Sequence, residues 1–169
     1  MASKFSRRNL LRYALGAIGG LIGSAVGIPV IGYFTAPARA ERHQEPWQAL
    51  GAASEFPLRT PQPAQFEHRL KDGWEAKVVK RGVWVVRTGE NDFTIYNPKC
   101  THLGCAVNWH PEHETFYSPC HGGVFALDGR VLDGPPPRPL DTLDWRVEND
   151  ILYCFYKDFQ VGLTYKKEI

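Results

Sequence analysis

Beyond residue 47 the sequence contains no convincing amphipathic helix, and over its 169 residues it is poor in cysteine and in net charge. Four cysteines are too few for a small scaffold held together by disulfides. A formal net charge of +2 is too small to imply a nucleic-acid partner. The length favours one compact domain, and the hydrophobic share of 43% and charged share of 22% are ordinary for a globular protein.

The N-terminal region combines a pair of arginines with a long uncharged stretch. Arg7 and Arg8 precede residues 13–35, which contain no charged residue. The arginine pair resembles a twin-arginine export signal, and the apolar run is long enough to cross a hydrocarbon layer of roughly 30 Å. We expect residues 1–12 to stay cytoplasmic and residues 13–35 to form an uncleaved single-pass anchor. The rest of the chain would then lie on the outer, periplasmic side of the plasma membrane.

Two other interpretations of this region stay open. The core helix of a soluble protein is disfavoured because the run has no polar face. A cleaved signal peptide is the stronger alternative, since Ala38-Arg39-Ala40 fits a small-x-small cleavage site. Residues 36–46 contain two prolines and no apolar periodicity, so they are predicted to be a linker to a domain that spans residues 47–169.

The exported domain is predicted to consist of antiparallel β structure. Short runs of β-branched and aromatic residues alternate with turn residues. Asp128-Gly129 and Asn149-Asp150 are signals for two-residue hairpin turns, and a further turn is expected at residues 81–82. The expected strands are residues 76–80, 83–87, 93–96, 124–127, 130–132, 146–148 and 151–156.

Three segments carry the residues with distinctive chemistry. C-T-H-L-G-C at residues 100–105 and S-P-C-H-G-G at residues 118–123 each place sulfur and imidazole close together. A thiolate and an imidazole two residues apart on a loop can both reach one small metal centre. The third segment, G-P-P-P-R-P-L at residues 134–140, is too rich in proline for a helix or a central strand and is expected to form a stiff lid.

Together, residues 98–140 resemble the two cluster-binding segments and the proline loop of Rieske proteins from cytochrome bc-type complexes. The family's segments read C-T-H-L-G-C and C-P-C-H-G-S, and the first is identical here. The resemblance implies an all-β fold: a Rieske-type antiparallel β-sandwich with a small cluster-binding subdomain, preceded by one N-terminal transmembrane helix. It also implies one [2Fe–2S] cluster, held in that family by two cysteines on one iron and two histidines on the other.

The resemblance also assigns the site residues position by position. Cys100 is expected to bind the inner iron, and His102 and His121 the outer, more exposed iron. Cys105 and Cys120 match the pair that forms a disulfide between the two cluster-binding segments. An exported protein can form such a bond because its compartment is oxidising.

One position departs from the family pattern, because Ser118 stands where the family has its second cysteine ligand. A serine hydroxyl binds iron only as a hard alkoxide, which sulfide-bridged iron favours less than thiolate. Three outcomes stay open at this point: Ser118 binds iron through oxygen, Cys120 becomes the ligand and gives up its disulfide with Cys105, or the cluster is absent. Cys154 lies in a predicted strand and is expected to be a small core residue.

The resemblance implies an electron-transfer subunit of a quinol:cytochrome c reductase, a protein that is not catalytic alone. His102 and His121 would face the quinol and accept a proton while the iron accepts an electron. The implied partners are the membrane, a cytochrome b subunit, a c-type cytochrome and a quinol, and the domain would swing on its linker.

High-potential family members carry hydroxyl donors at the positions of Gly123 and Phe125. Their absence here predicts a lower-potential cluster suited to menaquinol, and Gly123→Ser with Phe125→Tyr is expected to raise the midpoint potential.

Other functions remain as alternatives. The chain could be the Rieske subunit of another exported oxidoreductase, similar to arsenite oxidase, or a cluster-free structural relative. A nucleophilic Cys/His enzyme is disfavoured because Cys120 and His121 are neighbours in sequence, whereas catalytic pairs usually come from distant segments. His110 and His113 lie between the two cluster-binding segments and are expected at the surface.

Overall fold

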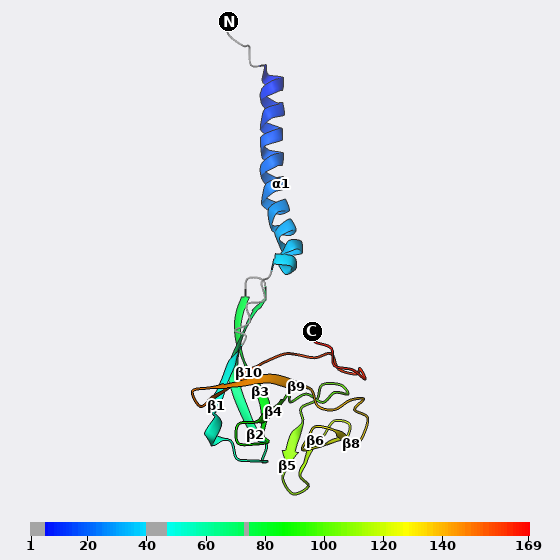
Figure 1. Ribbon diagram of the computed structural model, residues 1–169. Coiled ribbons are helices and arrows are strands. Elements are labelled where there is room, and N and C mark those ends of the chain that lie inside the picture. The colour runs from blue at the N-terminus through cyan, green and yellow to red at the C-terminus, as the bar shows by residue number, and fades with distance from the viewer. Residues whose placement is uncertain (1–5, 40–46, 73–74) are drawn as a thin grey trace. The chain divides into compact units, whose positions relative to one another are not determined.

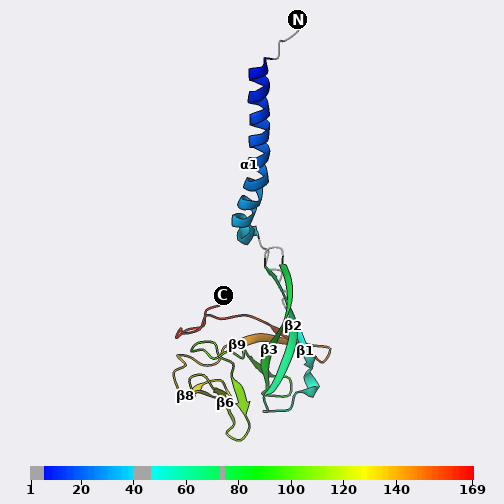
Figure 2. The same ribbon diagram turned by 180° about the vertical axis from the view of Figure 1, so that it is seen from behind.

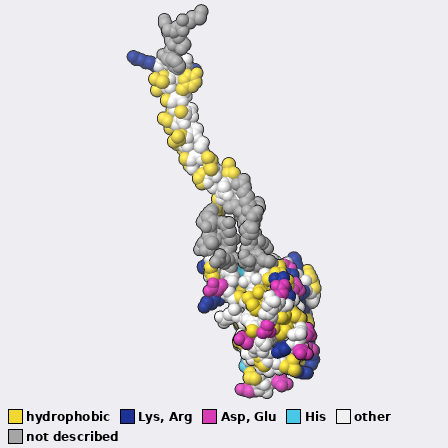
Figure 3. All heavy atoms as spheres, turned by 60° about the vertical axis from the view of Figure 1, so that its left-hand side comes forward, with side chains coloured by type: hydrophobic (Ala, Val, Ile, Leu, Met, Phe, Trp, Pro, Cys, Tyr) yellow, Lys and Arg dark blue, Asp and Glu magenta, His cyan; other side chains and the backbone are white. Residues whose placement is uncertain are grey.

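The computed structural model describes residues 6–39, 47–72 and 75–169. Its N-terminal element is helix α1, Arg7–Arg39, whose apolar side chains are exposed along the described length (Figure 3). The segment Arg7–Thr35 is long and apolar enough to cross a membrane, judged by length and composition. Residues 36–39 of the expected linker belong to α1, and residues 40–46 lie outside the described residues, so for them the linker stays a prediction.

The hydroxyl groups of Ser24 and Thr35, in the apolar part of α1, are satisfied within the helix. Ser24 Oγ donates to the carbonyl of Gly20 at 2.8 Å, and Thr35 Oγ1 donates to the carbonyl of Ile31 at 2.9 Å. Such bonds matter in lipid because no water is present to accept them. The helix is therefore compatible with a hydrocarbon environment.

The β domain is built on a six-stranded antiparallel sheet in the order β1-β10-β9-β4-β3-β2 (Figures 1 and 2). Val85, Ile95 and Leu152 are fully buried on three of these strands and belong to its core. The strands are β1 (Gln48–Ala52), β2 (Gln62–Asp72), β3 (Glu75–Arg87), β4 (Phe93–Tyr96), β9 (Thr142–Glu148) and β10 (Ile151–Phe155), and the 3-10 helix η1 (Ala53–Glu55) follows β1.

A second sheet of four strands holds the segments of interest. Its order is β5-β6-β7-β8. It is tied to the large sheet through Trp84 of β3, whose ring packs edge-on against Phe116 at 5.7 Å and whose Nε1 donates to the carbonyl of Val107 at 3.0 Å. The strands are β5 (Asn108–His110), β6 (Thr115–Ser118), β7 (Gly123–Ala126) and β8 (Val131–Asp133).

Both predicted hairpin turns are present. Asn149 and Asp150 have φ values of 52° and 61°, as a two-residue turn with two left-handed positions requires. Gly129 has φ 81°, and a Cβ there would lie 2.7 Å from the ring of Tyr96. Glycine is therefore needed at residue 129 for both its backbone conformation and its close packing.

The prediction of a turn at residues 81–82 was wrong. Strand β3 runs without interruption through these residues, and its hairpin partner is β2, which the sequence prediction missed. The signal for β2 was an alternation that proline and histidine obscured: Ala64, Phe66 and His68 are buried, whereas the residues between them are exposed. Gly82 keeps an extended conformation because a single glycine does not by itself end a strand.

Candidate metal centre

Three loops at one end of the small sheet contain the sequence-predicted site residues: the first loop (98–107), the second loop (118–123) and the proline loop (134–140). The first loop folds tightly on itself. The backbone N–H of Cys100 donates to the carbonyl of Cys105 at 2.7 Å, and the N–H of Gly104 donates to the carbonyl of Cys100 at 2.9 Å. Gly104 has φ 81°, which permits this turn.

A disulfide joins the first loop to the second. It links Cys105 and Cys120, whose Cα atoms are 6.4 Å apart. The bond commits the sulfur of Cys120, which could bind iron only if the disulfide opened. Cys100 and Cys154 are the free cysteines, and both are buried.

The two histidines predicted to bind metal come together from different loops. The rings of His102 and His121 lie 4.7 Å apart between centroids and nearly perpendicular to each other. His121 is exposed and His102 is half-buried. The Nδ1 atom of His102 is buried and has no hydrogen-bond partner, so one nitrogen of this ring faces the protein interior with nothing to bind.

The other two predicted positions belong to the same two loops as the histidines and are buried. Cys100 is 3% exposed as a free thiol, and Ser118 is 1% exposed with its Oγ lacking a hydrogen-bond partner. Unpaired buried polar atoms are rare in proteins because each costs free energy. Two such atoms, a buried free thiol and the ring of His121 are four donors, the number that a two-iron cluster requires.

Within the described part of the chain, no group of three or more histidine, cysteine or acidic side chains is placed to hold one metal ion.

The proline loop packs directly on the second loop. A Cβ added to Gly123 would lie 2.8 Å from Pro136 Cγ and 3.5 Å from Cys100 Sγ. Pro136 is itself buried, and Phe125 is fully buried. The space for the serine of high-potential relatives is thus filled by Pro136, so the variant Gly123→Ser must displace the proline loop before its hydroxyl can donate to anything.

Arg138, whose role was not predicted from the sequence, is buried in the proline loop. This side chain is 6% exposed and forms a two-pronged ion pair with Asp141, with Nε–Oδ1 at 3.0 Å and Nη2–Oδ2 at 2.7 Å. Its remaining donors bind the carbonyls of Leu163 and Gln160 at 2.6 and 2.9 Å. The available signal was a single charged residue within a proline-rich segment. A buried arginine needs a carboxylate partner, so this residue could have indicated an ion pair beneath the loop.

The same residue connects the proline loop to the first loop and to the C-terminal segment. Thr101 is fully buried, and its Oγ1 donates to the carbonyl of Arg138 at 2.7 Å. The backbone N–H of Gly162 donates to the carbonyl of Thr101 at 2.9 Å. The C-terminal segment therefore holds the first loop at Thr101, and the disulfide holds it at Cys105.

Lys99 of the first loop takes part in a small group of charged side chains centred on Asp158. Lys99, which precedes the first cysteine, pairs with Asp158 at 2.5 Å, and Arg81 approaches the same carboxylate at 3.7 Å. Tyr156 Oη donates to Asp158 at 3.1 Å. Burial raises the pKa of Asp158, but the hydrogen bonds and positive charges of these neighbours outweigh it and hold the pKa below its usual 3.8.

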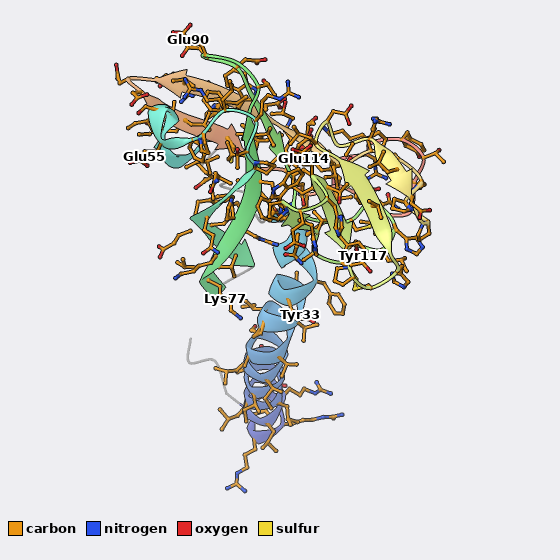
Figure 4. All side chains as sticks on the ribbon, turned by 90° about the horizontal axis from the view of Figure 1, so that it is seen from below. Tyr33, Glu55, Lys77, Glu90, Glu114 and Tyr117 are labelled. Atoms are coloured by element: carbon orange, nitrogen blue, oxygen red, sulfur yellow. A yellow bond between two sulfur atoms is a disulfide. The ribbon has the colours of Figure 1, made fainter. Side chains whose placement is uncertain are left out.

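Other titratable residues lie away from the loops. Burial and the nearby charge of Arg81 lower the pKa of His68 from its usual 6.5, so this ring stays neutral inside the core. Burial raises the pKa of Cys154 to about 12, as expected for an inert core thiol. His110 packs edge-on against Tyr117 of β6 at 5.5 Å, and His113 is exposed (Figure 4 labels Tyr117).

Comparison with known proteins agrees with this geometry. The chain matches the Rieske [2Fe-2S] domain family over residues 46–144. It is 30% identical over 156 residues to the menaquinol:cytochrome c reductase iron-sulfur subunit of Geobacillus thermodenitrificans, which covers 89% of this chain and 90% of that protein. It is 34% identical over 146 residues to the cytochrome b6-f complex iron-sulfur subunit of Chlorobaculum thiosulfatiphilum, with 86% and 73% covered.

Among solved structures, the chain is similar to the plasma membrane Rieske protein of Synechocystis PCC 6803. The two are 29% identical with a TM-score of 0.44, and the alignment covers 63% of this chain and 96% of that one. The family match and the relatives over most of the chain are decisive: this chain belongs to the Rieske [2Fe-2S] domain family.

Proposed function

We propose that this protein is the iron–sulfur electron-transfer subunit of a membrane-bound menaquinol:cytochrome c reductase. The observation that carries the proposal is the buried, unpartnered Nδ1 of His102, whose ring lies against that of His121. The buried free thiol of Cys100 is two residues away in the sequence. Relatives about 30% identical over most of the chain are named as subunits of such complexes.

Three residues are assigned as ligands on this basis. Cys100 binds the inner iron, and His102 and His121 bind the outer one. When bound, the cluster supplies a one-electron acceptor whose potential is higher than that of an all-cysteine cluster, because neutral imidazoles replace two thiolates.

The two histidines have a second task. Since Nδ1 of His102 faces inward, its Nε2 is left to accept a hydrogen bond from a quinol hydroxyl and then the proton. His121 is exposed beside it and can do the same. The loops that carry these rings are held by a disulfide and by the buried Arg138, so the proton acceptor stays in place between turnovers.

The membrane arrangement follows from the N-terminal region. Residues 1–12 serve as a twin-arginine-type signal, residues 13–35 anchor the chain, and residues 36–46 link it to the domain at 47–169. The basic residues before the span stay cytoplasmic, which places the domain on the outer side of the plasma membrane.

The partners are a cytochrome b subunit that presents the quinol and a c-type cytochrome that accepts the electron. Menaquinol is favoured because the hydroxyl donors that raise the potential in other members are replaced by Gly123 and Phe125.

Purification of the tagged full-length chain from its own membranes in mild detergent tests the proposal. We expect b-type and c-type haem spectra in the preparation and menaquinol-dependent reduction of cytochrome c. His121→Ala should abolish that reduction, whereas His113→Ala, an exposed histidine outside the three loops, should leave it unchanged. A chain that purifies without b-type haem, or a His121→Ala complex with the original rate, would contradict the proposal.

A further inference from the structure

We propose that the Oγ of Ser118 is the fourth protein ligand of the cluster, on the same iron as Cys100. The inference rests on the cluster of the proposed function and settles which donor replaces the family's second cysteine. Three independent features of the structure support it.

The first feature is the burial of an unpaired hydroxyl. Ser118 is 1% exposed, and its Oγ has no hydrogen-bond partner. Leaving a buried hydroxyl unpaired costs about 1–3 kcal/mol, and alanine at this position would avoid the cost. A metal bond satisfies the oxygen, so the cost disappears when the cluster is present.

The second feature is the direction of the side chain. Ser118 on β6 lies directly opposite Gly123 on β7 in the antiparallel pairing. Side chains of directly opposed residues point to the same face of a sheet. A Cβ at Gly123 would lie 3.5 Å from Cys100 Sγ, on the face that Pro136 also covers at 2.8 Å. The hydroxyl of Ser118 is therefore directed to the face on which the Cys100 thiol lies.

The third feature removes the competing donor. Cys120 is exposed and is bonded to Cys105. The backbone N–H of Gly122 also donates to the carbonyl of Ser118 at 3.1 Å, which closes the second loop in this conformation. Cys120 could reach the buried iron only if the disulfide broke and this turn opened, whereas Ser118 needs neither change.

The substitution changes the chemistry of the inner iron. Metal binding displaces the hydroxyl proton, and the alkoxide that remains is a harder donor than thiolate. A harder anionic donor stabilises the ferric iron more than the ferrous iron. The midpoint potential should therefore be lower than with cysteine at this position, in the same direction as the missing hydroxyl donors.

Five single variants of the full-length protein, purified in detergent, test the ligand. The measurements are iron and acid-labile sulfide per folded chain, low-temperature EPR of the reduced state, and redox titration. We expect Ser118→Cys to keep two irons with shifted g-values and a higher midpoint potential. Ser118→Ala should lose most of its iron and stay folded, because it removes an unpaired buried hydroxyl. Cys154→Ala, at the other buried free cysteine, is the control and should match the wild type.

The remaining comparison uses the disulfide partners, Cys105→Ser and Cys120→Ser. Both variants break the same bond, so they should lose the same fraction of cluster if Ser118 is the ligand. Selective loss of iron in Cys120→Ser alone would overturn the proposal in favour of Cys120. Full iron and an unchanged spectrum in Ser118→Ala would also overturn it, while leaving the electron-transfer function standing. A folded wild-type chain without iron would overturn both.

Discussion

The buried ion pair of Arg138 and Asp141 offers a quantitative test of how the cluster-binding loops are held. Both side chains are about 95% buried, and two hydrogen bonds join them. Replacing Arg138 with Met leaves the carboxylate of Asp141 buried without a partner. This change should lower the free energy of unfolding by about 3–5 kcal/mol. The carbonyls of Leu163 and Gln160 lose their donors too, but both lie near the surface and water can replace the arginine.

Urea unfolding of the full-length chain in detergent, followed by tryptophan fluorescence, measures this cost. The double variant Arg138→Met with Asp141→Leu should recover at least about 2 kcal/mol, because a buried ion pair replaced by apolar residues is often neutral. Arg130→Met is the matched control, since Arg130 pairs with Asp128 at 3.4 Å on the surface, and it should cost less than about 1 kcal/mol. A loss below about 1 kcal/mol for Arg138→Met would refute the reasoning.

Two further predictions concern packing and acid stability. Gly123→Ala should lower the free energy of unfolding by about 1–3 kcal/mol, because its Cβ would overlap Pro136. The control Gly82→Ala meets only an ordinary contact and should change the free energy of unfolding little. Equal urea midpoints for the two variants would contradict this prediction. The domain should also lose stability as the pH falls below 6.5, because the unfolded state protonates His68 before the folded state does, and Asp158 should add to the loss below pH 3.8. Urea midpoints that stay constant between pH 7 and pH 3 would count against it.

Much of the fold could be predicted from local signals. The hairpins at Asp128-Gly129 and Asn149-Asp150 were predicted correctly, because the positive φ values of such turns favour glycine, asparagine and aspartate. Strand β2 was missed because Pro63 and His68 interrupt an alternation that becomes visible only when burial is known.

The residue types of the candidate site could be predicted from the sequence. The contacts that hold its loops in place could not. The cysteine and histidine spacings indicated the loops, because the ligands of a small metal centre cluster in sequence. The role of Arg138 depends on Asp141 and on a C-terminal segment more than 20 residues away, and no local pattern reveals such a contact. Likewise, the burial of Ser118 is a tertiary property, so the sequence alone left its role open.

The most direct test of the central claim is a combined assay of the wild-type full-length protein, purified from membranes with iron–sulfur assembly intact. Iron, acid-labile sulfide and the low-temperature EPR spectrum of the reduced protein are measured on the same folded sample. We expect two irons and two sulfides per chain with a Rieske-type signal. A folded chain that contains neither iron nor sulfide and gives no signal would contradict it.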